Sequence, residues 1–321
     1  MLYGFVKFIA RLALRFYCRD LKINNPAFLH SDGPLMLAAN HPNSFLDAIL
    51  LCTLFDRPVY SLARGDVFRK QWLARILFSL KLLPVYRVSE GADNLEENYK
   101  TFDVCKDIFK QNGIVLIFSE GRCVNEWHLR PLKKGTARLA LSSWEEGIPL
   151  KVLPVGINYS SFRRFGKNVH LFIGEFITVQ DVLPVAGHGR SIQRFNALLK
   201  GQLGQSVYEI GKGDHTRLKA VFFKPQPVLK RTLLYIPALF GWLLHAPLYL
   251  PVRSLVNKML NSRDHFDSMA VALLFLVYPL YVLAISLIVL MLANYWLALL
   301  SLLVLPGTAW STVQLKRQMD A

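Results

Sequence analysis

The sequence predicts an α/β domain followed by a helical membrane region. Short apolar runs alternate with amphipathic stretches from Pro34 to about Gly174, a pattern typical of a mixed, largely parallel sheet flanked by helices. Residues 269–313 carry no charged side chain, which is enough apolar chain for a hairpin of two membrane-spanning helices. A length of 321 residues accommodates one large domain with such an appendage.

The α/β domain is expected over residues 26–225. Its candidate strands are 34–39, 59–63, 82–87, 114–118, 152–157 and 169–173. The stretches expected to be helical are 45–55, 68–80, 95–111 and 136–146. Sheets of this kind form their sites at the carboxyl ends of the strands. His41, Arg87 and Glu120 lie at or just after such ends.

Residues 1–25 predict an amphipathic helix at the membrane surface. Basic residues recur every three or four positions, with apolar residues between them; they are Lys7, Arg11, Arg15, Arg19 and Lys22. Such a helix can lie among lipid headgroups with its apolar face inserted, and each cation near an anionic surface adds about 1 kcal/mol. The alternative is an ordinary surface helix packed on the α/β domain.

Residues 226–321 predict the membrane region. The segment 233–252 is apolar but contains three prolines and a histidine, which favours a re-entrant or interfacial element. Two spans are expected within 269–313, with a tight turn near Asn294 and Tyr295. Basic residues flank this pair on both sides. The positive-inside rule therefore predicts an integral protein of a cell or organelle membrane, with the catalytic domain on the cytoplasmic face.

The charge of the chain indicates an acidic partner. The formal net charge is +16 and the isoelectric point is near 9.8, which suits nucleic acid, anionic lipid or a phosphorylated substrate. A hydrophobic content of 53% and a mean hydropathy of +0.29 are high for a soluble nucleic-acid binder, and no nucleic-acid motif is found. Membrane lipids are therefore the expected partner, not nucleic acid. The four cysteines are scattered without metal-ligand spacing, so no metal site is expected.

The segment from Asn40 to Asp47 contains a candidate general base. An imidazole with a pKa of about 6.5 takes a proton from an alcohol near neutral pH, and a carboxylate on its other nitrogen fixes the tautomer. His41 and Asp47 are six positions apart, and six residues of a helix rotate about 600°, so the two side chains meet only if His41 precedes the helix. Pro42 at the first helical position then places Asp47 in the second turn.

Further segments carry polar chemistry. An apolar run ends in Arg87, whose guanidinium suits phosphate. A strand then turns at Ser119-Glu120-Gly121-Arg122 and exposes a carboxylate beside a glycine. Lys133 and Lys134 open a helix, which is a reasonable entry for an anion. The run Leu153-Pro154-Val155 places a proline inside a strand, which indicates a special local conformation.

Taken in order, these segments resemble the glycerolipid acyltransferase family, which includes glycerol-3-phosphate and 1-acylglycerol-3-phosphate acyltransferases. The resemblance covers roughly residues 30–180. Its four motifs are matched in order by His41 with Asp47, by Arg87, by Phe118-Ser119-Glu120-Gly121 and by Leu153-Pro154-Val155. The first motif has five residues between His and Asp where four is commoner, and it resembles a subgroup that includes yeast-type glycerol-3-phosphate acyltransferases. In the third motif Ser119 replaces proline and Arg122 arrives one position early.

The resemblance implies a glycerol-phosphate-acyltransferase-like fold and its chemistry. His41, oriented by Asp47, would deprotonate an acceptor hydroxyl, which attacks the thioester carbonyl of acyl-CoA or of acyl-carrier protein. These thioesters are cosubstrates, the carrier protein would be a partner where it is the donor, and no metal, cofactor or covalent intermediate is needed. Backbone N–H groups at the start of the helix after Pro42 are candidates for holding the oxyanion.

The resemblance also implies an acceptor site. Arg87, Glu120 and Gly121 would shape it, with Arg87 as the phosphate contact and Glu120 as a hydroxyl or structural contact. Arg122, Lys133 and Lys134 either bind the same phosphate or are simply solvated.

The expected function is that of a membrane-bound O-acyltransferase of phospholipid biosynthesis, acting on glycerol 3-phosphate or a lysophospholipid. An alternative acceptor is a lyso-amino-acid lipid, such as an ornithine or glycine lipid, and the discriminating feature is whether Arg87 and the lysines converge near His41. Another alternative is a non-catalytic protein that binds anionic membranes. The intact His41 and Asp47 disfavour it.

Overall fold

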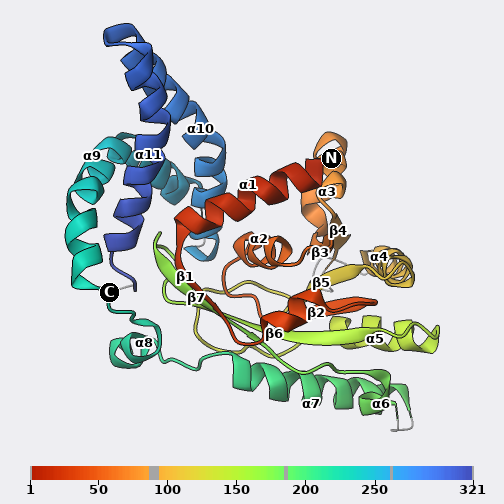
Figure 1. Ribbon diagram of the computed structural model, residues 1–321. Helices are drawn as coiled ribbons and strands as arrows, with labels where there is room; N and C mark the ends of the chain where they lie inside the picture. Colours follow the sequence, from red (N-terminus) through yellow and green to blue (C-terminus); the bar gives the residue numbers. More distant parts are fainter. Residues whose placement is uncertain (1, 87–93, 184–186, 261–262, 320–321) are drawn as a thin grey trace. The chain divides into compact units, whose positions relative to one another are not determined.

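The computed structural model describes residues 2–86, 94–183, 187–260 and 263–319 (Figure 1). Seven strands form one sheet in the order β1-β7-β6-β2-β5-β3-β4. Because β2 pairs in parallel with β5 and β6, and β3 pairs in parallel with β5 and β4, the predicted mixed, largely parallel sheet is confirmed. The strands are β1 Cys18–Ile23, β2 Leu35–Ala39, β3 Val59–Arg64, β4 Leu82–Val85, β5 Ile114–Phe118, β6 Lys151–Tyr159 and β7 Lys167–Ile173.

Helices cover both faces of the sheet (Figure 1). They are α2 Phe45–Leu54, α3 Gln71–Ser79, α4 Asn94–Lys110, α5 Gly135–Glu145, α6 Val179–Val182 and α7 His188–Ser206, with 3-10 turns η1 Pro26–His30 and η2 Gly65–Phe68. On one face α4, α5 and α7 pack on Met36 and Val115 of the central strands. Helix α2 lies on the other face and buries Leu46, Leu50 and Leu51. The central strands are therefore buried on both sides, as their continuous apolar runs predict.

Contacts divide the chain into two units. Unit 1 comprises residues 1–11, 22–158 and 170–212, and unit 2 comprises residues 12–21, 159–169 and 213–321.

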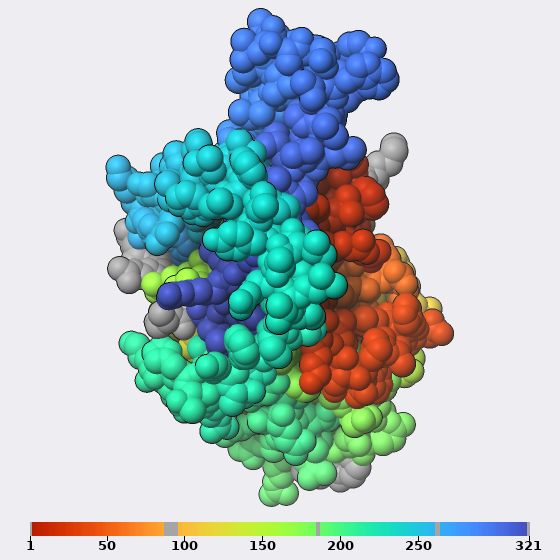
Figure 2. All heavy atoms as spheres, turned by 60° about the vertical axis from the view of Figure 1, so that its left-hand side comes forward, coloured from red at the N-terminus to blue at the C-terminus, as the bar shows by residue number. Residues whose placement is uncertain are grey.

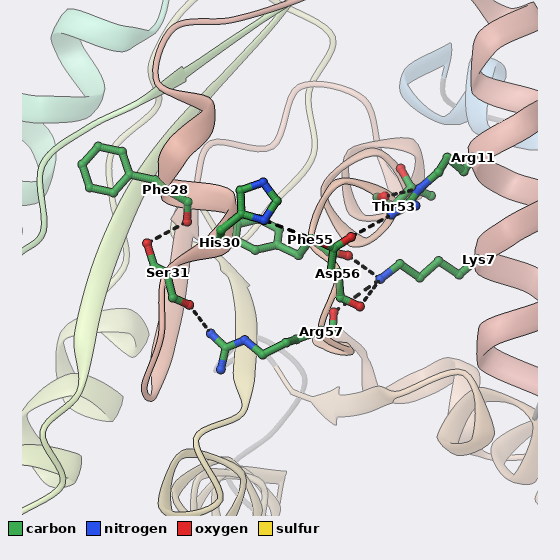
Figure 3. A network of polar contacts seen from close by, with 9 residues as sticks. All are labelled: Lys7, Arg11, Phe28, His30, Ser31, Thr53, Phe55, Asp56 and Arg57. Atoms are coloured by element: carbon green, nitrogen blue, oxygen red, sulfur yellow. Dashed lines mark hydrogen bonds and ion pairs between the residues drawn. The ribbon is translucent and has the colours of Figure 1, made fainter.

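The first part of helix α1, Leu2–Tyr17, belongs to unit 1 and is held there by two basic residues (Figure 3). Lys7 Nζ donates to the carbonyl of Phe55 and, at 3.1 Å, to that of Asp56. Arg11 Nε donates to the carbonyl of Thr53 at 2.9 Å. These carbonyls lie at and just beyond the carboxyl end of α2, where helical carbonyls lack intrahelical partners and cations are favoured. The two cations therefore bind protein, which supports the packed-helix alternative for this part of the stripe.

One set of apolar residues of α1 is exposed. Phe5 is 66% exposed and Phe8 is 60% exposed, and Leu12 and Phe16 are also exposed. The sequence predicts this helix over residues 1–25, whereas the structure ends it at Tyr17 and continues into β1. The difference has a physical reason: β1 is the neighbour of β7 in the sheet, and this tertiary pairing outweighs the local helical period.

Unit 2 contains α8 His215–Phe222, the 3-10 turn η4 Arg263–His265 and three long apolar helices, α9 Val228–Met259, α10 Phe266–Leu292 and α11 Tyr295–Leu315. Each long helix has the length and composition to cross a membrane. The expected hairpin is present, since α10 and α11 pack against each other and Ser286 of α10 is hydrogen-bonded to Ser301 of α11 at 2.7 Å. Between them Asn294 accepts a hydrogen bond from Leu297 N at 3.0 Å and caps α11. The joined ends of α10 and α11, drawn in blue in Figure 2, carry exposed apolar side chains: Met291 is 86% exposed and Leu292 is 83% exposed.

Helix α9 differs from the element expected at 233–252. It is one helix of 32 residues that runs through Pro237, Pro247 and Pro251. Its length and composition suit a span as well as an interfacial element. A re-entrant or interfacial position for 233–252 stays a prediction.

Candidate active site

The site begins where the two neighbouring strands β2 and β5 end. Ala39 is the register partner of Phe118, and Ser119 N donates to the carbonyl of Ala39 at 2.9 Å. Because the strands are parallel, the loops that follow them leave the same edge of the sheet. This brings the residues after Ala39 next to those after Phe118, although about 80 positions separate them in sequence.

His41 and Asp47 form the pair that the sequence predicts. His41 Nδ1 lies 2.9 Å from Asp47 Oδ2, and the same oxygen accepts the backbone N–H of Asn43 at 2.8 Å. Asp47 is fully buried, whereas the side chain of His41 is 18% exposed. An ionised carboxylate only accepts hydrogen bonds, so Nδ1 carries the proton and Nε2 is left as the base.

The local helix starts later than expected. Helix α2 begins at Phe45, not at Pro42, so Asp47 lies in its first turn instead of the second. The chain reaches this start through Ser44, whose φ of 52° is in the left-handed region that costs a non-glycine residue free energy. The carboxylate thus sits at the amino end of α2, where the helix dipole favours negative charge.

Phe118 fixes the imidazole from a second direction. Its ring stacks on that of His41, with ring centres 3.9 Å apart and planes inclined by 13°. The plane of the imidazole is thus set by stacking and its rotation by Asp47. Phe118 belongs to the third motif, but its contact with His41 was not part of the sequence prediction.

Glu120 joins the two loops. One oxygen of its carboxylate accepts the backbone N–H of His41 and the other accepts that of Arg130, both at 3.0 Å. Burial raises the pKa of Glu120 above its ordinary value, against the effect of these two donors. The residue is 4% exposed. These contacts make Glu120 a clamp on the backbone of the general base, and its predicted substrate contact stays a prediction.

Several residues outside the predicted set also hold the loop around His41. Asn40 accepts from Ile157 N at 2.7 Å and donates to the carbonyl of Ile157 at 3.0 Å, which ties the loop to β6. Asn125 Nδ2 donates to the carbonyl of Pro42 at 2.7 Å. The N–H of Ser44 donates to Cys123 Sγ at 2.9 Å.

These contacts reduce the set of backbone N–H groups that can bind the oxyanion. The N–H groups of Asn43 and Ser44 are already bound, to Asp47 and to Cys123. The first backbone amides after Pro42 are therefore not free to receive a developing charge.

The predicted basic residues lie on the loops after β5. Arg122, Lys133 and Lys134 are exposed. Gly121 has a φ of +66°, and a Cβ built there would lie 3.0 Å from Lys133 Cγ, so Gly121 and Lys133 are in close contact. The other basic candidate, Arg87, lies outside the described residues. Its expected convergence with the lysines stays a prediction, as does the expected absence of a metal.

Residues 20–158 match the family model described as Acyltransferase. This segment contains all four motifs and every predicted site residue. No curated protein matches the chain. Among solved structures, the 1-acyl-sn-glycerophosphate (LPA) acyltransferase PlsC from Thermotoga maritima is similar, with 15% sequence identity and a TM-score of 0.42 over 62% of this chain and 78% of that chain. The family match over residues 20–158 confirms the resemblance to acyltransferases that the four motifs predict.

Proposed function

We propose that the protein is a membrane-bound acyltransferase that moves a fatty acyl group from acyl-CoA or acyl-carrier protein to a hydroxyl of glycerol 3-phosphate or 1-acylglycerol 3-phosphate. The observation that carries the proposal is the His41–Asp47 pair at the edge of the sheet, with its tautomer fixed by a buried carboxylate. The family supplies the reaction type, and the site supplies the base that such a reaction requires.

The chemistry proceeds in one acyl transfer. His41 Nε2 takes the proton of the acceptor hydroxyl as its oxygen attacks the thioester carbonyl, and Asp47 stabilises the imidazolium that forms. The new C–O bond replaces the C–S bond when the tetrahedral intermediate collapses. The proton passes from His41 to the departing thiolate, which regenerates the neutral base.

Basic side chains support an acceptor that carries phosphate. Arg122, Lys133 and Lys134 are exposed on the loops that follow β5, next to the clamp residue Glu120. Arginine and lysine at such a position attract phosphate from solution. Arg87 is proposed as a further phosphate contact on the strength of the family motif.

The membrane location is supported by three helices of suitable length and composition and by the exposed apolar stripe of α1. An acyltransferase whose product is a lipid benefits from this location, because the product partitions into the bilayer. The cations that flank the α10–α11 hairpin support a cytoplasmic position for its two ends and, with 233–252 re-entrant or interfacial as predicted, for the catalytic domain as well.

The test is transfer from radiolabelled palmitoyl-CoA, or from palmitoyl carrier protein, by the detergent-solubilised full chain. Glycerol 3-phosphate, 1-acylglycerol 3-phosphate and lyso-ornithine lipid are offered in parallel. We expect product with a phosphate-bearing acceptor, lost in His41→Ala and kept in His188→Ala, whose exposed imidazole lies on α7 outside the site.

Product only with the lyso-amino-acid lipid would overturn the phosphate assignment but keep the acyl transfer. No product from any pair of donor and acceptor, with liposome binding unchanged in His41→Ala, would favour the non-catalytic alternative.

A further inference from the structure

Cations from two other parts of unit 2 lie near Lys316, the residue that follows α11. Arg164 lies between β6 and β7, and Arg253 lies in the last two turns of α9. Lys316 Nζ lies over the rings of Phe165, the sequence neighbour of Arg164, and of Tyr249, one helical turn before Arg253, so both arginines are close enough to act electrostatically on it. We call Arg164, Arg253 and Lys316 the basic cluster. No step of the proposed acyl transfer uses it.

Lys316 is held in place by aromatic rings and by the backbone. Its Nζ lies 5.6 Å from the ring centre of Phe165 and 5.1 Å from that of Tyr249, and these rings meet edge to face at 5.5 Å. Arg19 Nη2 donates to the carbonyl of Lys316 and, at 2.9 Å, to that of Val313. The cation is therefore positioned at the end of the helical bundle instead of ranging through solvent.

The acid that acts on Lys316 is already neutralised. Asp267 forms an ion pair with Lys167, with side chains 2% and 0% exposed. In the described part of the chain, the buried Nε and Nη1 atoms of Arg19 meet no acceptor. Burial, with Arg164 and Arg253 as further causes, lowers the pKa of Lys316 to about 8, which leaves it mainly charged at neutral pH. Such partly desolvated positive charge favours an anion.

The position of the cluster selects the kind of anion. The second half of α9 packs on the start of α10 through Val252, Val256 and Phe266, and Lys316 follows the end of α11, so the cluster lies at the open end of the α10–α11 hairpin. Arg253 is about 9 Å of helix before the end of α9, a distance comparable with the polar headgroup layer of a bilayer. Arg253 is exposed and Arg164 is partly exposed, so both can reach a ligand.

We propose that the basic cluster binds the phosphate of an anionic phospholipid headgroup at this end of the helices. The inference rests on the proposed membrane location of the helices and is independent of the acyl transfer. Free phosphate offers the same chemistry, so the experiment must separate the two sources.

The test is native mass spectrometry of the full chain in detergent with added dioleoyl phosphatidylglycerol, dioleoyl phosphatidylcholine or inorganic phosphate. The variant is Arg164→Gln with Arg253→Gln. The matched control is Lys258→Gln with Arg317→Gln, which removes the same charge from exposed residues at the same helix ends. At about 1 kcal/mol per cation, we expect phosphatidylglycerol to bind about thirtyfold more weakly to the variant. Binding to the control should equal that to the wild type.

Equal binding of phosphatidylglycerol to variant and wild type would overturn the proposal, as would equal retention of phosphatidylcholine by the wild type. If inorganic phosphate binds and displaces the lipid, the claim that the ligand is a lipid headgroup is refuted and the cluster is a site for free anions. Should the double variant unfold, Arg253→Gln alone tests the same loss at an exposed position, with about fivefold weaker binding expected. The readout is lipid binding, so a failed acyl-transfer assay would not affect it.

Discussion

The replacement Asp47→Asn tests the central hydrogen bond of the site. Asp47 Oδ2 accepts from both His41 Nδ1 and Asn43 N. An asparagine can place its oxygen there, which keeps both hydrogen bonds but removes the charge. It can instead place its NH2 group there, which forces the proton of His41 onto Nε2 and removes the base.

The magnitude follows from the geometry. With Nδ1 and Oδ2 2.9 Å apart, the centres of charge of imidazolium and carboxylate are about 4 Å apart, and at an effective dielectric constant near 20 they attract by about 4 kcal/mol. Losing this stabilisation in the transition state lowers the rate by about a thousandfold. The wrong tautomer costs about ten thousandfold in an analogous triad of another enzyme. We therefore expect a fall in kcat of about a thousandfold to ten thousandfold.

The assay is release of free CoA from palmitoyl-CoA in the presence of the acceptor, with product formation measured in parallel. Asp66→Asn is the matched control, since that carboxylate pairs with Arg64 outside the site. A folded Asp47→Asn enzyme whose kcat stays within about tenfold of the wild type would refute the assigned role of the carboxylate.

Three further predictions concern the clamp, the buried ion pair and helix α1. Replacing Glu120 by Gln should lower the free energy of unfolding by about 1–3 kcal/mol, because one of two backbone donors then faces an NH2 group. Because the pKa of Glu120 is raised in the folded state, its contribution to the free energy of unfolding should fall as the pH rises from 4.5 through the raised pKa. Denaturation at several pH values measures this slope, and the opposite slope would contradict the reasoning. Lys167→Met should destabilise the full chain in detergent by about 3–5 kcal/mol, because it leaves Asp267 buried and unpaired. Adding Asp267→Leu should restore most of the lost stability. A double variant as unstable as the single one would argue against this. A photoactivatable lipid should label Phe5 and Phe8 of α1 but not the exposed Val104 of α4, and mass spectrometry that finds equal labelling contradicts an inserted α1.

The catalytic pair could be predicted from sequence because its chemistry is local. His41 and Asp47 lie within one loop and the first turn of one helix, so spacing alone limits how they meet. The position of Glu120 just after a strand could also be predicted, because the alternation of apolar runs shows where the strands end. The supporting contacts have no such signal: Asn40 bonds to Ile157, 117 positions away, and only the parallel register of β2 and β6 brings them together.

Helix α1 shows a second limit of sequence patterns. Amphipathic spacing defines two faces but does not say which one contacts protein. The apolar face would ordinarily pack inward, yet the carbonyls at the end of α2 offer Lys7 and Arg11 partners that water would otherwise supply. With these cations bound to protein, Phe5 and Phe8 remain outside, where exposed aromatic side chains are costly in water. We infer that α1 contributes to membrane attachment mainly by inserting apolar side chains and less by attracting lipid phosphates.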